Sequence, residues 1–396
     1  MSQHQDPVVI VSAARTPMGA FQGDFSDLAA HDLGGTAIKA AVERAGIPAE
    51  KVEEVLFGNC LMAGQGQAPA RQAGFKGGLP QSTGAVTLSK MCGAGMEATI
   101  LAHDQLIAGS REVMIAGGME SMTNAPYLLK KGRAGYRMGH DKVYDHMMLD
   151  GLEDAYEAGR SMGTFGEDCA AKYSFTREQQ DAYAIASVQR AQAAAQSGAF
   201  DAEITPVTVK TRKGEVTISV DEGPAKAKLD KISSLKPAFK KDGTITAASS
   251  SSINDGAAAM VLMRESTAKA LGCKPLAKIV AHGTHAQDPE WFTTAPVGAT
   301  QKALKKAGWS VEDVDLWEVN EAFAVVPMAL MAELNVPHDK VNVHGGACAL
   351  GHPIGASGAR IIVTLIHALQ RHGKKKGVAT LCIGGGEGTA MAIELV

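Results

Sequence analysis

Short apolar segments alternate with longer stretches of helical periodicity along most of the chain. The segments cover residues 8–11, 55–58, 85–88 and 113–118 in the first half, and 277–280, 316–319, 341–343 and 379–386 in the second. Short, nearly continuous apolar runs between helical stretches are typical of a largely buried sheet covered by helices. The pattern therefore predicts a mixed α/β fold.

One helical stretch differs from the others in its polarity. The stretch after Pro353 is apolar on nearly every face, as Ile361, Ile366 and Leu369 illustrate. A surface helix keeps a polar face, whereas a helix between two layers does not. We therefore predict that this helix is buried between layers. The helical stretch after residue 93 is expected to end near Gly109, because glycine commonly terminates helices.

The apolar segments of the two halves correspond to each other in order. Their offset is nearly constant, at roughly 260 to 270 positions, which indicates an internal repeat. The final segment of the second half, residues 387–395, matches residues 255–263, far beyond residue 118. The chain is therefore expected to comprise a first half of residues 1–122 plus 246–272, an inserted domain of residues 123–245, and a second half of residues 273–396.

The inserted stretch contains two elements with clear local signals. Thr176 and Gln179 have the spacing of a capping box, and the alanine-rich sequence that follows favours a helix through about Gln196. Alternating apolar residues on both sides of residue 213 predict a hairpin. Residues 126–148 have no period, and such long irregular loops are usually functional or contact another subunit.

The composition is that of a globular protein. Of the 396 residues, 45% are hydrophobic and 20% are charged, and no apolar run approaches the ~20 residues that span a bilayer. Residues 1–6 lack the basic and apolar blocks of a signal peptide, and the last residues are no peroxisomal signal. We therefore expect a cytoplasmic protein without membrane partners.

The net charge of −3 does not favour nucleic acid as a partner, but one segment is basic. Between Lys210 and Lys241 there are nine Lys and Arg residues and only four acidic residues. A basic segment on an acidic protein suggests an anionic ligand, and a solvated charged surface explains it equally well.

None of the six cysteines forms a C-x-x-C pair, so neither a metal site nor a thioredoxin motif is predicted. Free thiols are the expectation for a large cytosolic chain. Cys60, Cys169 and Cys273 have no local signal and are expected to be small buried hydrophobic residues. Cys348 remains open, because it lies only four residues before His352.

Two glycine-rich turns each present a reactive residue at the start of a helix. The first is Met-Cys-Gly-Ala-Gly at residues 91–95, and the second is Gly-His-Pro-Ile-Gly-Ala-Ser-Gly at residues 351–358. If the halves are copies, the Cys92 thiol and the His352 imidazole meet as an activated nucleophile. The helix N-terminus is expected to lower the pKa of Cys92 and to offer N–H groups to an oxyanion. Pro353 fits the first helical position. The Cys92 turn by itself would favour an inert, tightly packed helix start, and a histidine at a helix start is usually only hydrogen-bonded.

Two more polar residues follow predicted strands. Cys382 lies two residues before a run of three glycines, where it could be a resolving thiol, a metal ligand or a base. Asn320 ends another strand and could orient a water molecule, donate to an oxyanion, or simply cap a helix.

These segments together resemble the thiolase family. The resemblance rests on four motifs in the family's order and spacing: Met-Cys-Gly-Ala-Gly at 91–95, Asn-Glu-Ala-Phe at 320–323, Gly-His-Pro-Ile-Gly-Ala-Ser-Gly at 351–358 and Cys-Ile-Gly-Gly-Gly-Glu-Gly at 382–388. Arg-Thr-Pro at 15–17 and Gly-Gly-Met-Glu-Ser-Met at 117–122 are also similar. The resemblance covers nearly the whole chain and implies a layered αβαβα fold of two similar halves, with an inserted loop domain in the first.

The resemblance implies a reversible Claisen condensation of two acetyl-CoA to acetoacetyl-CoA and CoA, as in acetyl-CoA C-acetyltransferases. Cys92 would carry the acyl group as a thioester, and His352 would activate its thiol. Cys382 would remove the α-proton of the second acetyl-CoA. Asn320 would hold a water that, with His352, stabilises the enolate oxygen. The N–H groups of Cys92 and Gly384 would form a second oxyanion hole.

The resemblance also implies that coenzyme A is a substrate and product, with no permanently bound cofactor or metal. Ser251, Phe239, Met162 and Phe323 would contact CoA or its pantetheine arm, and the basic segment would face its phosphates. A homotetramer, a dimer of dimers, is implied, with the stretch after Pro126 near the tetramer contact.

Three departures from the family pattern surround the expected acyl pocket. They are Ser161, the serine run 249–252 and residues 291–294, and they leave the chain-length preference open. A degradative 3-ketoacyl-CoA thiolase of broader chain length is therefore the alternative. Cys382 argues against a β-ketoacyl synthase. The intact set of reactive residues argues against a non-enzymatic acyl-CoA-binding relative. The lack of paired ligand spacing argues against a Cys/His metal-binding protein.

Overall fold

The computed structural model describes residues 6–396 and contains one large sheet of ten strands. The strands are β1 (Val8–Arg15), β2 (Gly19–Ala20), β3 (Glu54–Gly58), β4 (Gly84–Leu88), β5 (Val113–Ser121), β10 (Asn254–Arg264), β11 (Ala277–Ala286), β12 (Leu316–Val319), β13 (Lys376–Ile383) and β14 (Glu387–Leu395). The helices around them are α1 (Ala30–Ala45), α2 (Pro69–Lys76), α3 (Ala94–Ile107), α7 (Glu265–Leu271), α8 (Ala295–Ala307), α9 (Val325–Leu334), α10 (Ala347–Leu350) and α11 (Ile354–Arg371), with 3-10 turns η1 (Ala49–Lys51), η4 (Pro289–Thr294) and η5 (His338–Lys340).

The strand order repeats about the middle of the sheet. The order is β12-β13-β14-β11-β1-β10-β5-β3-β4, with β2 paired to β10. In the first half β3 is parallel to β5, β5 is antiparallel to β10, and β10 is antiparallel to β1. In the second half β12, β13, β14 and β11 follow the same scheme. The predicted matches between the halves are therefore confirmed for these four pairs of strands.

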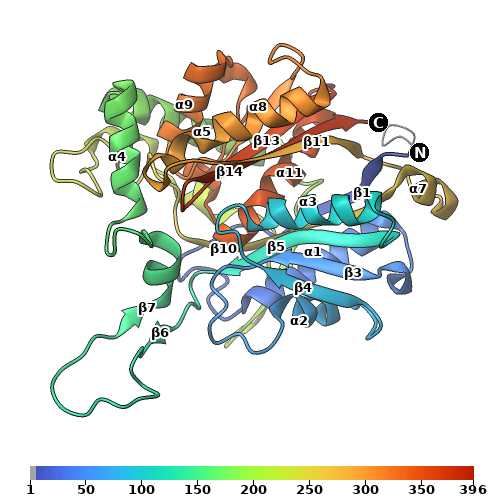
Figure 1. Cartoon of the computed structure of the whole chain (residues 1–396), viewed down its shortest axis with the longest axis horizontal. Helices are drawn as coiled ribbons and strands as arrows, with labels where there is room; N and C mark the ends of the chain where they lie inside the picture. The colour runs from blue at the N-terminus through green and yellow to red at the C-terminus, as the bar shows by residue number, and fades with distance from the viewer. Residues whose placement is uncertain (1–5) are drawn as a thin grey trace.

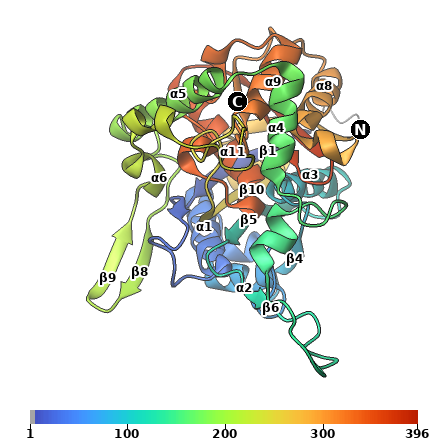
Figure 2. The ribbon, with the colours of Figure 1, turned by 90° about the vertical axis from the view of Figure 1, so that its left-hand side faces the viewer.

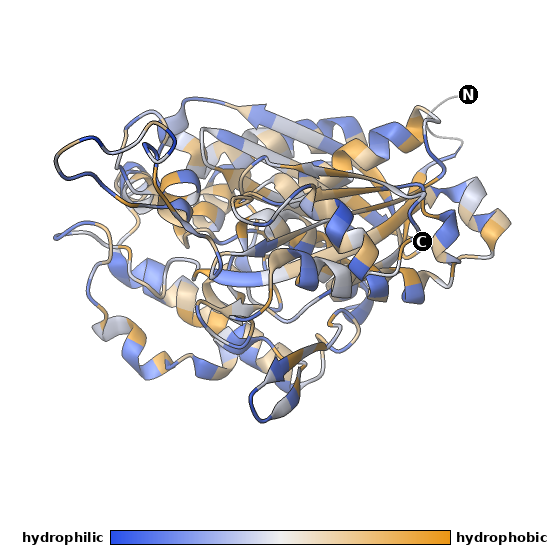
Figure 3. Ribbon diagram, turned by 90° about the horizontal axis from the view of Figure 1, so that it is seen from below, coloured by the Kyte–Doolittle hydropathy of each residue, from blue (hydrophilic) through white to orange (hydrophobic). Residues whose placement is uncertain are grey.

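The halves meet at two adjacent pairs of residues in β1 and β11, Val9 with Lys278 and Ile10 with Ala277. Beyond this seam the two parts of the sheet separate and enclose α3 and α11 (Figure 1). Helices α1 and α2 cover the outer face of the first half, and α8 and α9 cover that of the second. Figure 3 shows apolar strands beneath helices of mixed polarity. The layered αβαβα architecture is confirmed.

Helix α11 is buried along nearly its whole length, as predicted from its apolar faces. Its side chains and those of α3 fill one core with residues of both half-sheets. Because water reaches neither side of this helix, no polar stripe is needed. Arg360 is the buried exception, and its guanidinium pairs with Glu318 at 3.3 Å.

The inserted stretch wraps around one end of the layers. It contains β6 (Tyr127–Leu128), β7 (Tyr144–Asp145), η2 (Met148–Leu152), α4 (Met162–Tyr173), α5 (Arg177–Gln196), β8 (Val207–Thr211), β9 (Gly214–Ile218), α6 (Glu222–Lys226) and η3 (Leu229–Ser234). The capping box is confirmed, because Thr176 Oγ1 accepts from the Gln179 N–H and Gln179 Oε1 accepts from the Thr176 N–H. The hairpin is also confirmed and projects from the body (Figure 2). The loop between β6 and β7 also projects from the body (Figure 1), on the opposite side from the hairpin in Figure 2.

Two local expectations differ from the structure. Residues 341–343 form no strand, only a bridge between Val341 and Trp317. The Asn342 side chain bonds both the N–H and the C=O of Val319 at 2.8 Å, so it takes the place of a strand partner. Pro353 caps α11 and does not open it. Helix α3 does end near Gly109, which follows the C-cap residue Ala108 with φ of 72°.

Among residues 6–396 no helix is both long and apolar enough to cross a membrane. The expectation about a leader concerns residues 1–6, of which residues 1–5 lie outside the described part of the chain.

Candidate active site

Glycines bring the first turns of α3 and α11 into direct backbone contact. A Cβ atom on Gly95 would lie 2.7 Å from the Ala359 nitrogen, and one on Gly358 would lie 2.4 Å from the Met96 nitrogen. A Cβ on Gly118 of β5 would lie 2.1 Å from the Gly355 oxygen. Only glycine permits such approaches. Cys92 lies three residues before Gly95 and His352 six residues before Gly358, so this contact brings the two reactive turns close together.

Each turn enters its helix through a residue in the left-handed region. Met91 has φ of 45° immediately before Cys92, and Gly351 has φ of 100° immediately before His352. A side chain at positive φ is uncommon and is often associated with functional strain. The shared geometry at equivalent positions agrees with the repeat.

Cys92 lies against the turn that follows β13. A Cβ on its neighbour Gly93 would be 2.4 Å from Cδ1 of Ile383, and the Gly384 N–H donates toward the Cys92 sulfur. The N–H of Cys92 itself does the same. Burial nevertheless raises the pKa of the Cys92 thiol to about 11, although both N–H groups act to lower it. The expected lowering of this pKa is therefore wrong in direction, because desolvation outweighs the helix N-terminus.

The contacts of His352 define its tautomer. The Ser357 hydroxyl donates to the Pro353 carbonyl at 2.9 Å, so its oxygen accepts from His352 Nδ1 at 2.5 Å. The proton is then on Nδ1, and Nε2 has a free lone pair. Burial, with the charge of Arg360 as a further cause, lowers the pKa of His352 to about 3. The imidazole is therefore a neutral base at physiological pH.

Asn320 lies beside this free nitrogen. Its Nδ2 is 3.4 Å from His352 Nε2, at the outer limit of a hydrogen bond. Its Oδ1 is buried and has no hydrogen-bond partner among the described residues. Such an unpaired buried oxygen is suited to accept from a water molecule.

Cys382 ends β13 in a fully enclosed position. Its side chain is buried, and burial together with the neighbouring Cys92 raises the pKa of its thiol well above the usual range. After it, Gly385 and Gly386 have φ of 96° and 91° and turn the chain into β14. The structure therefore brings both thiols and the imidazole together from three separate segments.

Glu120 was not singled out in the sequence. Its carboxylate accepts from the N–H groups of Cys60, Leu61 and Gly355 and from the Asn59 amide, at 2.6–3.1 Å. It thereby ties the end of β3 to the start of α11. Burial raises the pKa of Glu120 to about 7, although the N–H groups that donate to its carboxylate act to lower it. Its place within the motif at 117–122 was the only available signal.

Glu321 is a second acidic residue that sequence reasoning missed. It accepts from Tyr183 Oη at 3.0 Å and Ser187 Oγ at 2.7 Å, both on α5, and from the Cys348 N–H at 2.9 Å. Burial and Glu321 raise the pKa of Cys348 well above its usual range, so Cys348 is a protonated structural thiol. Glu321 thus anchors the inserted stretch beside Asn320.

The remaining cysteines differ in burial. Cys169 is buried, as predicted, whereas Cys60 and Cys273 are only partly buried. The Cys60 thiol donates to the Met91 carbonyl at 3.2 Å and so supports the turn before Cys92. The Cys273 thiol points to the Ala45 carbonyl at 3.6 Å, away from the other reactive residues.

Three of the four expected CoA contacts form one apolar group. Phe239 and Phe323 meet edge to face with centroids 5.7 Å apart, and Met162 packs with them in the same cluster. The Met162 sulfur would be 3.5 Å from a Cβ on Gly384, so this group borders the turn after Cys382. Ser251 is held next to it, since its N–H donates to the Ala322 carbonyl at 2.9 Å.

The basic segment divides into two parts. Its residues near the hairpin, such as Arg212 and Lys213, are exposed and project from the body (Figure 2). Lys236, Lys240 and Lys241 are also exposed but flank Phe239 in the sequence. The second part is therefore the better placed for an anion bound at the Phe239 group.

Two family models match almost the whole chain. The thiolase N-terminal domain matches residues 8–266, and the thiolase C-terminal domain matches residues 273–395. The protein belongs to the thiolase family, as the motifs indicated.

Named relatives and solved structures are similar to the chain over nearly its whole length. An acetyl-CoA acetyltransferase of Chromobacterium violaceum is 51% identical over 389 residues, which cover 98% of this chain and 99% of the relative. The crystal structure of the Bacillus anthracis acetyl-CoA acetyltransferase has a TM-score of 0.96 at 42% identity and 99% coverage of both chains. The Acat5 thiolase from Ascaris suum, solved in complex with coenzyme A, has a TM-score of 0.93 at 42% identity and covers 98% of this chain and 100% of its own.

Proposed function

We propose that the protein is an acyltransferase that reversibly condenses two acetyl-CoA to acetoacetyl-CoA and CoA. The observation that carries the proposal is the meeting of Cys92, a neutral His352 and Cys382, with two N–H groups directed at the Cys92 sulfur. One thiol and a base suffice for acyl transfer, but forming a C–C bond needs a second base.

In the first half-reaction His352 Nε2 takes the Cys92 proton, and the thiolate attacks the acetyl-CoA carbonyl. The thiol of Cys92 is protonated at neutral pH, so the neutral imidazole is required. The N–H groups of Cys92 and Gly384 stabilise the oxyanion. The carbon–sulfur bond to CoA breaks, and CoA leaves with the proton of Cys382.

In the second half-reaction the Cys382 thiolate removes an α-proton from the second acetyl-CoA. A raised pKa makes this thiolate a strong base. Asn320 holds a water molecule that, with the protonated His352, stabilises the enolate oxygen. The enolate carbon attacks the acetyl-Cys92 carbonyl, and the departing thiolate recovers its proton from His352, so all residues return to their initial states.

Coenzyme A enters as substrate and product, with Met162, Phe239, Phe323 and Ser251 around its pantetheine arm. The solved complex of the Ascaris suum relative with coenzyme A supports coenzyme A as the substrate. The same proposal includes three structural units: a first half of residues 1–122 plus 246–272, an inserted domain of residues 123–245 and a second half of residues 273–396. It also includes a cytoplasmic location and a homotetramer that uses the loop after Pro126.

The acetyl-specific reaction is preferred over a broader 3-ketoacyl-CoA thiolase. The 51% identity to an acetyl-CoA acetyltransferase of Chromobacterium violaceum over 98% of this chain supports this preference. Thiolysis of a C4 ketoacyl-CoA should therefore be faster than that of a C8 ketoacyl-CoA. Equal or faster cleavage of the C8 substrate would favour the alternative.

Two alanine variants test the division of labour between the thiols. We expect Cys92→Ala to reduce thiolysis of acetoacetyl-CoA at least about a thousandfold and to prevent acetylation of the protein. We expect Cys382→Ala to reduce thiolysis of acetoacetyl-CoA about a hundredfold or more, yet still to accept one acetyl group at Cys92. Mass spectrometry after incubation with acetyl-CoA distinguishes the two.

Cys273→Ala is the matched control, because this thiol lies away from the site. It should retain full activity. Unchanged activity in Cys92→Ala would overturn the proposed function.

A further inference from the structure

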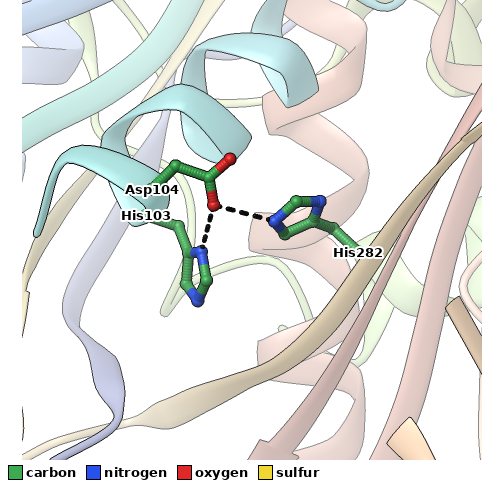
Figure 4. A group of neighbouring side chains, drawn as sticks. All are labelled: His103, Asp104 and His282. Atoms are coloured by element: carbon green, nitrogen blue, oxygen red, sulfur yellow. Dashed lines mark hydrogen bonds and ion pairs between the residues drawn. The ribbon is translucent and has the colours of Figure 1, made fainter. Parts of the chain in front are cut away.

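Two histidines and an aspartate from different halves of the chain converge at the far end of α3. His103 and Asp104 lie in the last turns of α3, and His282 lies on β11 (Figure 4). His103 Nδ1 is 2.9 Å and His282 Nε2 is 3.0 Å from the same oxygen, Asp104 Oδ1. Figure 4 shows both rings directed at this oxygen.

These separations are those of ligands around one small cation. One atom from each residue lies within 4.8 Å of the other two. Nitrogen and oxygen ligands at ~2.0–2.2 Å from a first-row transition metal are themselves ~3.0–3.5 Å apart. Only small side-chain shifts would therefore admit an ion.

The surroundings leave room for further ligands. The three residues line an open cavity of about 840 Å³, and the side chain of Asp104 is 55% exposed, whereas both imidazoles are mostly buried. Water can therefore complete a coordination sphere of which the protein supplies one side. The rigid helix and strand hold the histidines in place.

The local field on balance favours a cation. The C-terminal end of α3 carries the negative end of its dipole, and Glu97 lies two turns earlier on the same helix. Lys306 opposes this, since its ammonium bonds the His282 carbonyl at 3.0 Å. Lys278 also lines the cavity but pairs with Glu394 at 2.7 Å.

We infer that His103 Nδ1, Asp104 Oδ1 and His282 Nε2 form a binding site for a divalent transition metal such as Zn²⁺. Two imidazoles and one carboxylate are a common donor set for this class of ion. Without an ion, His103 Nδ1–H and His282 Nε2–H donate to the Asp104 carboxylate. On binding, each neutral imidazole moves its proton to the other ring nitrogen by exchange with water and turns the freed lone pair to the metal, so no redox partner is needed.

The site acts on stability and not on the condensation. Cys92 precedes the first turn of α3, and a helix rises ~1.5 Å per residue, so His103 is ~15 Å away from it. The ion would join α3 of the first half to β11 of the second, close to the two-pair seam of the sheet. Binding to the folded state alone raises the unfolding temperature.

Metal titration of the full-length, chelator-treated protein tests the inference. We expect one Zn²⁺ or Co²⁺ per chain and a higher unfolding temperature. His282→Ala and Asp104→Asn should each weaken metal binding at least about a hundredfold. Loss of a residue that only hydrogen-bonds a metal ligand already lowers metal affinity ~10- to 100-fold, and these residues are direct ligands. Asp104→Asn preserves side-chain shape, which guards against a folding defect.

Two controls separate this site from the reactive thiols. His140→Ala removes an exposed histidine elsewhere, and Cys92→Ala removes the nucleophile; both should keep the ion. The Co²⁺ spectrum should lack a thiolate charge-transfer band. Wild-type affinity in His282→Ala, a thiolate band, or absence of any binding would overturn the inference. None of these measurements depends on enzymatic activity.

Discussion

At the scale of single residues, the base in the active site depends on a hydroxyl one helical turn away. Ser357 accepts from Nδ1 of His352 while its own proton goes to the Pro353 carbonyl. This arrangement leaves Nε2 as the free base. The serine was visible in the sequence only as a small residue of a glycine-rich motif.

Ser357→Ala should therefore lower kcat about tenfold to a hundredfold, because the neutral imidazole loses the contact that selects its tautomer. The measurement is steady-state thiolysis of acetoacetyl-CoA. Thr99→Val is the matched control: Thr99 is a buried hydroxyl on α3 that also bonds a carbonyl four residues earlier, Gly95, without contacting a histidine. Equal losses in both variants would reduce the role of Ser357 to helix stability.

The Cys92 thiol illustrates the limit of local reasoning about single residues. A helix N-terminus stabilises a thiolate, and that feature is legible in the sequence. The degree of burial is not, and burial raises the pKa of Cys92 to about 11. In the proposed mechanism the Cys92 thiol therefore relies on His352, which comes from the other half of the chain.

At the scale of elements, the site depends on how closely α3 and α11 approach. Gly358→Ala would place a Cβ 2.4 Å from the Met96 nitrogen, and backbone at that distance cannot move independently of its helix. Overpacking of this kind costs about 1–3 kcal/mol or more. We expect a lower unfolding temperature together with a large loss of thiolysis, since the two reactive turns separate.

Gly74→Ala is the corresponding control within helix α2. There the nearest atom to the new Cβ is Leu79 Cδ1 at 3.6 Å, an ordinary contact. An alanine in a helix should be neutral or stabilising by about 0.5–1 kcal/mol. Wild-type activity and stability in Gly358→Ala would contradict the role given to this junction.

At the scale of the whole molecule, burial of histidines makes stability dependent on pH. Burial is the first cause in each case: it lowers the pKa of His352 to about 3 and that of His344 to about 4, and it lowers the pKa of His282 and His367 as well. The unfolded chain binds protons at these residues near pH 6.5, where the folded chain does not. The contribution of these histidines to the free energy of unfolding should therefore fall as pH decreases from about 6.5 towards 4, whereas the raised pKa of Glu120 acts in the opposite direction.

His344→Gln tests the sign and size of this effect. His344 is buried, with Nε2 3.2 Å from Nε2 of His372. Removing its titration should reduce the slope of unfolding free energy against pH by up to about 1.4 kcal/mol per pH unit between pH 4 and 6.5. Chemical denaturation at several pH values measures the slope, and the exposed His140→Gln is the control. An unchanged slope in His344→Gln would refute the assignment.

The elements that the sequence predicted best are those with local causes. The capping box at Thr176 and the strand matches between halves follow from spacing and periodicity, which act over a few residues. Residues 341–343 were predicted as a strand for the same reason. Contacts between the Asn342 side chain and Val319 decided otherwise, and such contacts are not encoded in local periodicity.

The sequence alone was enough to identify the family and to predict the reactive residues, because side-chain chemistry and motif spacing are properties of the sequence. Only packing decided that Cys92, His352 and Cys382 share one site, that desolvation raises one pKa and lowers another, and that His103 and Asp104 meet His282. The physical reason is range: helix and strand preferences act between neighbours, whereas burial and long-range contact depend on which surfaces the folded layers bring together.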